Sequence, residues 1–65
     1  MKAEDIDLLL DGCGFLETQS GNLYEYCGMV NGKYYFQDIN DQSEGSWLFL
    51  TYLQLLSDST FTVQI

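Results

Sequence analysis

The dipeptide Asn31-Gly32 constrains the fold of this chain more than any other feature. A two-residue hairpin turn of type I′ needs positive φ at both central positions, which asparagine and glycine tolerate best. Residues 23–30 and 33–39 flank the dipeptide and are rich in aromatic and β-branched side chains. We therefore expect two antiparallel strands joined by this tight turn.

The tight turn also fixes the register of the predicted hairpin, with Val30 opposite Lys33 and later pairs following outward. An uninterrupted register places Glu25 directly opposite Asp38, which is an unfavourable pair of like charges. The face assigned to the core carries Cys27, Met29, Tyr34 and Phe36. The opposite, exposed face carries Tyr24, Tyr26, Tyr35 and Ile39.

Two segments before the hairpin complete its N-terminal side. Residues 3–11 have the apolar spacing of a short helix that ends at Gly12 or Gly14, since glycine suits the left-handed position after a helix. Residues 15–18 predict a short first strand, followed by a turn over residues 19–22.

Two segments after the hairpin complete the predicted fold. Residues 47–56 are rich in leucine and predict a second helix capped by Ser43 or Ser46, although a continuous apolar run also suits a buried strand. Residues 60–65 alternate as an amphipathic strand. Its expected inward side chains are Phe61, Val63 and Ile65.

The predicted order of elements is helix, three strands, helix, strand. This order indicates one α+β domain over residues 1–65, with two layers: an antiparallel sheet of three or four strands and both helices on one face. A chain of 65 residues has a small core, because it buries only about 60% of its unfolded surface. A hydrophobic content of 46% is nevertheless too high for an acidic disordered tail.

Charge is the strongest indication of function. Ten carboxylates stand against two lysines, with no arginine and no histidine, and the formal net charge is −8. A field of one sign repels nucleic acid and anionic membranes, and it steers the protein toward basic surfaces. We therefore expect a protein partner, with no direct binding of nucleic acid or membrane.

The sequence does not favour catalysis, a metal site or a cofactor. Acids near Cys13 raise rather than lower a thiol pKa, and no nucleophile–base pair or phosphate-binding loop is visible. Residues 38–44 resemble the opening of a calcium loop, but Ser43 replaces the turn glycine and Phe49 replaces the bidentate glutamate. The two cysteines are too few for a disulfide scaffold, so we expect reduced thiols.

Carboxylates and tyrosines supply the candidate partner-binding residues. On a helix over residues 3–11, three acids share one face with an outward leucine between them. Acids spaced over a rigid surface can imitate DNA phosphates, and tyrosines supply large contact areas. The full candidate set is Glu4, Asp7, Leu8, Asp11, Tyr24, Glu25, Tyr26, Tyr35, Asp38, Asp41 and Glu44.

In size, acidity and predicted fold the chain resembles the small acidic inhibitors encoded by phages and mobile elements. These include anti-CRISPR proteins, restriction-blocking DNA mimics and inhibitors of uracil-DNA glycosylase. The likeness covers the whole chain, but no motif carries it, so no functional positions transfer. It implies a non-enzymatic inhibitor that binds a basic, nucleic-acid-binding surface of a larger protein.

Two other functions fit the same composition. An antitoxin or immunity protein that neutralises a basic toxin would need the same acidic surface. An oligomeric structural or adaptor subunit, for example a homodimer, would bury the excess apolar surface of residues 47–56. The first residues lack the pattern of a secretory signal, and the longest apolar run, residues 48–50, is too short to span a membrane, so we expect a cytoplasmic protein.

Overall fold

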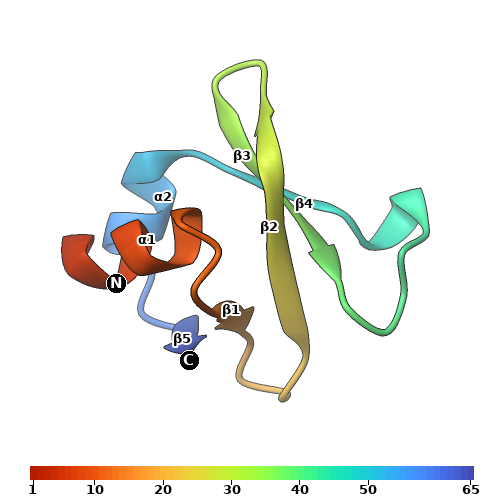
Figure 1. Ribbon diagram of the computed structural model, residues 1–65, viewed down its shortest axis with the longest axis horizontal. Helices are drawn as coiled ribbons and strands as arrows, with labels where there is room; N and C mark the ends of the chain where they lie inside the picture. The colour runs from red at the N-terminus through yellow and green to blue at the C-terminus, as the bar shows by residue number, and fades with distance from the viewer.

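Five antiparallel strands form one curled sheet in the computed structural model, which describes all 65 residues (Figure 1). The strands are β1 (Phe15–Glu17), β2 (Leu23–Val30), β3 (Lys33–Asp38), β4 (Leu48–Leu50) and β5 (Thr62–Gln64). Their order in the sheet is β4-β3-β2-β1-β5, so β1 to β4 form a meander and β5 returns to pair with β1. The other elements are the helices α1 (Ala3–Leu10) and α2 (Tyr52–Ser57) and the single 3-10 turn η1 (Glu44–Ser46). The predicted α+β class is confirmed, with more strands than expected.

The apolar run over residues 47–56 is a strand followed by a helix, so the prediction of one continuous helix is wrong. Leu48 and Leu50 pack against the core from β4, and Phe49 between them is exposed. A capping box at Thr51 sets the start of α2. Its hydroxyl accepts a hydrogen bond from the Gln54 N–H at 3.1 Å, and the Gln54 side chain accepts one from the Thr51 N–H at 2.7 Å. Neither predicted serine caps this helix.

The hairpin of β2 and β3 has the predicted turn. Asn31 and Gly32 have φ values of +52° and +78°, as a type I′ turn requires. Val30 pairs with Lys33, and the next two pairs also follow the predicted register. The tip of the hairpin projects beyond the rest of the molecule (Figure 1), which explains why Met29, predicted to lie in the core, is 58% exposed.

A β-bulge then shifts the register by one residue. Between Tyr26 and Gly28 the pairing skips Cys27, and Gly28 adopts a φ of +139°, which L side chains rarely adopt. Tyr26 therefore pairs with Phe36 and Tyr24 with Asp38, while Glu25 lies opposite Gln37. The predicted pairing of Glu25 with Asp38 is wrong.

The bulge exchanges the two faces of β2, because a slip of one residue turns every later side chain over. Tyr24 and Tyr26, predicted to be on the exposed face, pack against the core. The Tyr26 ring centroid lies 5.7 Å from that of Phe36 and 5.9 Å from that of Tyr34. Cys27, predicted to face the core, is exposed. Tyrosine rings thus replace a carboxylate on the buried side, which avoids burying an unpaired charge.

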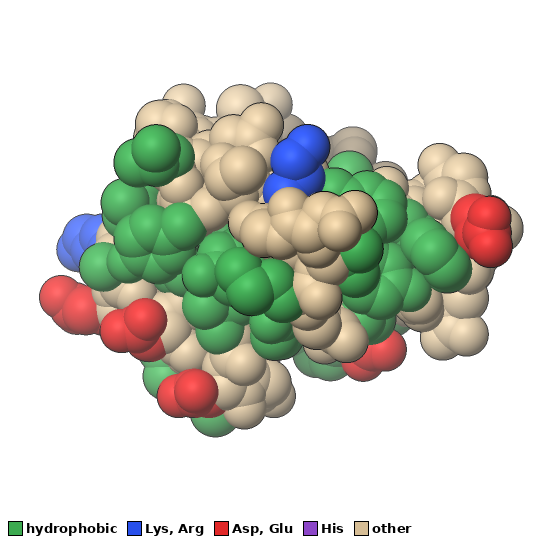
Figure 2. All heavy atoms as spheres, turned by 90° about the horizontal axis from the view of Figure 1, so that it is seen from above, with side chains coloured by type: hydrophobic (Ala, Val, Ile, Leu, Met, Phe, Trp, Pro, Cys, Tyr) green, Lys and Arg blue, Asp and Glu red, His purple; other side chains and the backbone are tan.

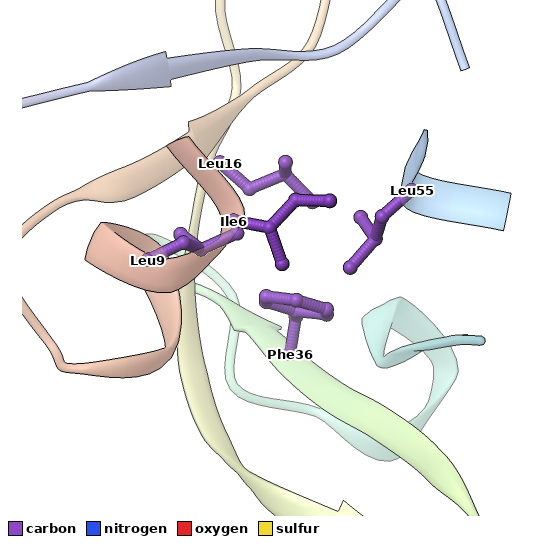
Figure 3. Packing of buried hydrophobic residues seen from close by; sticks show 5 residues of the cluster. All are labelled: Ile6, Leu9, Leu16, Phe36 and Leu55. Atoms are coloured by element: carbon purple, nitrogen blue, oxygen red, sulfur yellow. The ribbon is translucent and has the colours of Figure 1, made fainter. Parts of the chain in front are cut away.

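One small core joins both helices to the sheet (Figure 3). Its fully buried side chains point toward one another from four elements and are Ile6, Leu9, Leu16, Phe36 and Leu55. Phe61 and Val63 pack against this cluster, as predicted. Ile65 follows the last residue of β5 and is 79% exposed, so its predicted inward position is wrong.

Helix α1 ends at Leu10, and Gly12, one of the two glycines at which the sequence predicted its end, turns the chain away. The Gly12 N–H donates to the Leu9 carbonyl at 3.1 Å, and the Cys13 N–H donates to the Leu8 carbonyl at 3.0 Å. This pair of bonds, with a Gly12 φ of +77°, forms a Schellman motif. The motif turns the chain from α1 into β1.

The capping box predicts the effect of changing Thr51. We expect Thr51→Ala to lower the free energy of unfolding by about 1 kcal/mol, because the Gln54 N–H loses its acceptor. Urea denaturation followed by circular dichroism measures this loss. Thr51→Ser keeps the hydroxyl and should restore most of the stability. Equal stability of the alanine variant and the original protein would show that the capping box does not stabilise α2.

Candidate functional site

Exposed carboxylates gather at opposite ends of the molecule, whose longest dimension is 28 Å. One group lies on α1 and the other on the loop that contains η1, and these two elements stand far apart in Figure 1. Seen from above, acidic side chains lie at the margins of a broad hydrophobic area (Figure 2). The predicted acids therefore do not form one continuous row.

The α1 group is as the sequence predicted. Glu4, Asp7 and Asp11 are exposed, with Leu8 exposed beside them, while Ile6 and other apolar residues of the helix face the core. An acid in the first turn favours the helix dipole, whereas Asp11 at the last turn opposes it. The placement of Asp11 is therefore not explained by helix stability.

Two carboxylates at the end of β3 and in the loop after it accept hydrogen bonds from residues two positions later in the chain. The Asp38 carboxylate accepts a hydrogen bond from the Asn40 N–H at 2.8 Å. The Asp41 carboxylate accepts one from the Ser43 hydroxyl at 2.7 Å and one from the Ser43 N–H at 3.1 Å. These two bonds hold the pKa of Asp41 below its ordinary value. Asp38 and Asp41 thus stabilise the loop, while Glu44 is an exposed acid of η1.

Three aromatic side chains gather on the side of the sheet away from the core. We call Tyr35, Trp47 and Phe49 the outer aromatic cluster. The Tyr35 ring centroid lies 4.9 Å from that of Trp47, edge to face, and 5.5 Å from that of Phe49, with an interplanar angle of 19°. The Trp47 indole N–H donates to the Gln42 carbonyl at 3.2 Å, and the Gln37 amide donates to the Tyr35 hydroxyl.

Only Tyr35 of this cluster was among the predicted partner-binding residues. Trp47 and Phe49 were missed because their segment was assigned to a helix. The capping box at Thr51 and Gln54, read together with the alternation of residues 48–50, is the sequence signal that separates strand from helix here.

The same side of the sheet also carries acids. Glu25 pairs with Gln37, and both side chains alternate with inward ones, so they project on the side of Tyr35. Glu17 projects outward from β1 because its neighbour Leu16 is buried. We call this surface the outer face: the outer aromatic cluster over β3 and β4, with Glu25 and Glu17 beside it. Tyr24 and Tyr26 are not part of it.

A small hollow of about 210 Å³ lies between the α1–β1 turn and β2. The residues that line it include Cys13 and Glu25, together with Phe15, Tyr26 and Ile65. Burial and the charge of Glu25 raise the pKa of the other free thiol, Cys27, which makes it a poorer nucleophile. No group of three or more His, Cys, Asp or Glu side chains is arranged to hold a metal ion.

Comparisons with protein-family models, curated proteins and solved structures found no match to this chain. Neither helix has the length and apolar character needed to cross a membrane.

The bonds to Asp41 predict how its carboxylate titrates. Ser43→Ala should raise the Asp41 pKa toward its ordinary value of 3.8, because the hydroxyl bond is the largest cause of the lowered value. An NMR pH titration of the Asp41 carboxyl carbon measures this change. Ser46→Ala is the control, since the Ser46 hydroxyl donates to backbone carbonyls instead. An unchanged Asp41 pKa in the Ser43 variant would contradict the assignment.

The same bonds give the sign of a pH effect on stability. The pKa of Asp41 is lower in the folded than in the unfolded chain, so the unfolded chain binds more protons as the pH falls. The contribution of this carboxylate to stability is therefore present above the unfolded pKa and is lost as the pH falls through the folded pKa. Asp58, held by the Thr60 hydroxyl and N–H, has a lowered pKa and follows the same rule.

Proposed function

We propose that this protein is a non-enzymatic inhibitor that docks on the basic, nucleic-acid-binding surface of a larger protein. The observation that carries the proposal is the net charge of −8, with acids exposed on α1, on β2 and in the η1 loop. Two lysines cannot neutralise ten carboxylates, so most of the negative charge remains available to attract a basic partner. This is the character of the anti-defence proteins of phages and mobile elements.

The proposed mechanism is exclusion without turnover. The carboxylates take the place of phosphates against the lysines and arginines of the partner, whose affinity for nucleic acid comes largely from such contacts. The bound protein then blocks the groove sterically and repels the approaching nucleic acid. Binding of this kind weakens as salt concentration rises. The proposed place of action is the cytoplasm of the cell that contains the target.

The alternative of an antitoxin or immunity protein shares the surface and the mechanism, and only the identity of the partner separates the two. A self-assembling subunit is a different class. It is favoured by the exposure of Leu53 and Met29, at 75% and 58%, and by the two free sheet edges at β4 and β5. Self-assembly would bring together copies that each carry eight net negative charges, which repel one another.

A pull-down with the tagged protein, from an extract of cells in which it is made, tests the proposal. The expected result is a nucleic-acid-binding protein that is retained at low salt and released by added DNA or RNA. Recovery of this protein alone, without any such partner, would contradict the proposal and favour the self-assembling subunit.

Two triple variants test the role of charge once the partner is purified. Each removes three negative charges: one by Glu4→Gln, Asp7→Asn and Asp11→Asn on α1, the other by Glu17→Gln, Glu25→Gln and Glu44→Gln on and beside the outer face. We expect at least one of them to bind about tenfold more weakly and with a flatter salt dependence, since rim and interface charges set both quantities. Calorimetry at several salt concentrations measures both. If neither variant differs from the original protein, these six acids are not part of the interface.

A further inference from the structure

The outer aromatic cluster lies outside the core, yet its rings are held in place. Tyr35 lies on the side of β3 opposite to Phe36, the buried ring of the core. The rings of Tyr35 and Phe49 stack at an interplanar angle of 19°, and the Trp47 indole is fixed by its bond to the Gln42 carbonyl. Phe49 is 42% exposed. The result is a rigid aromatic surface in contact with water.

Carboxylates lie beside this aromatic surface. Glu25 is exposed on β2, and Glu17 follows on β1, where its carboxylate accepts a hydrogen bond from the Thr62 hydroxyl at 3.5 Å. Glu44 is exposed in η1, shortly before Trp47 along the chain. Planar rings with Glu25 and Glu17 on one face, and with Glu44 in the adjoining η1 loop, are together complementary to a planar cation.

We infer that the outer face binds an arginine-bearing segment of the partner, with a guanidinium group between the outer aromatic cluster and the carboxylates of Glu25 and Glu44. This inference rests on the proposed function and names the face and the chemistry it uses. A guanidinium group stacks on aromatic rings through its planar surface while its edge donates paired hydrogen bonds to a carboxylate. A lysine ammonium can make a cation–π contact, but it cannot stack as a plane or donate paired hydrogen bonds, because it is a compact, strongly hydrated point charge.

Other occupants of the outer face fit less well. A second copy of the chain cannot supply the guanidinium group, because the sequence contains no arginine. A nucleic acid or an anionic membrane meets a repulsive field of the same sign. The basic grooves of nucleic-acid-binding proteins are rich in arginine, which agrees with the partner proposed above.

Lys33 is the cation on this side of the hairpin. It is two residues from Tyr35 and four from Gln37 along β3, so its side chain starts from the same side of the sheet, at the end near the turn. Its ammonium group repels an arginine on the outer face. Lys33→Gln should therefore strengthen the binding of arginine peptides.

Trp47 makes the inference directly testable, because it is the single tryptophan of the chain. The protein is titrated with a capped hexa-arginine peptide and, separately, with a capped hexa-lysine peptide, while the Trp47 indole resonance is followed by NMR. We expect the arginine peptide to bind about fivefold more tightly and to shift the Trp47 indole, since an advantage of about 1 kcal/mol for the stacking guanidinium group corresponds to that ratio.

Variants separate stacking from charge. Phe49→Leu should reduce the preference for arginine over lysine, because one of the three rings is lost, and should leave the weak binding of the lysine peptide unchanged. The double variant Glu25→Gln, Glu44→Gln should weaken the binding of both peptides. Leu53→Ala, which changes an exposed apolar residue of α2 away from the outer face, is the matched control and should leave the preference intact.

Equal affinity for the two peptides, or shifts confined to α1 with an unmoved Trp47 indole, would overturn the inference. The two proposals can fail separately. If the purified partner is bound but Phe49→Leu and the double glutamate variant bind it normally, the outer face is not the site and the proposed function stands. If the arginine peptide binds as expected but no nucleic-acid-binding partner exists, the proposed function fails and the site stands.

Discussion

The β-bulge at Cys27 and Gly28 is the feature on which the rest of this structure depends. By letting one residue of β2 stand without a partner, it turns Tyr24 and Tyr26 toward Phe36 and turns Glu25 away from it. A regular hairpin would place a carboxylate on the buried side, where an unpaired charge is costly. The bulge requires a φ of +139° at position 28, and Gly28 can adopt it because glycine has no side chain.

The bulge also decides which side chains of β2 face the core and which face outward. Inward rings of β2 and β3 complete a core that has only five fully buried side chains, so their packing matters greatly in a domain of this size. The outward side is left to Glu25, Gln37 and the outer aromatic cluster. A bulge increases the local twist of a hairpin, which agrees with the curled sheet seen in Figure 1. Stability and the proposed binding chemistry thus occupy opposite sides of one sheet.

Local rules of the chain predicted much of this fold. Asn31-Gly32 predicted the turn and the first three pairs of the hairpin, and Gly12 predicted the end of α1, because each depends on φ angles that few residues adopt. The bulge was not predictable in this way, since its advantage appears only when Tyr26 meets Phe36 in the core. Likewise, the apolar run of residues 48–50 suits a helix as well as a strand, and only the pairing with β3 makes it a strand. The acids of α1 were placed correctly, whereas Tyr24 and Tyr26 moved inward with the bulge.

Ring-to-ring nuclear Overhauser effects of Tyr26 test the central claim most directly. The account predicts strong effects between the Tyr26 ring and the rings of Phe36 and Tyr34, whose centroids lie 5.7 and 5.9 Å away. It also predicts none between Tyr26 and Phe49. Effects from the Cys27 side chain to the Phe36 ring, with Tyr26 instead near the outer aromatic cluster, would show a regular hairpin without a bulge. Both the core and the outer face described here would then be wrong.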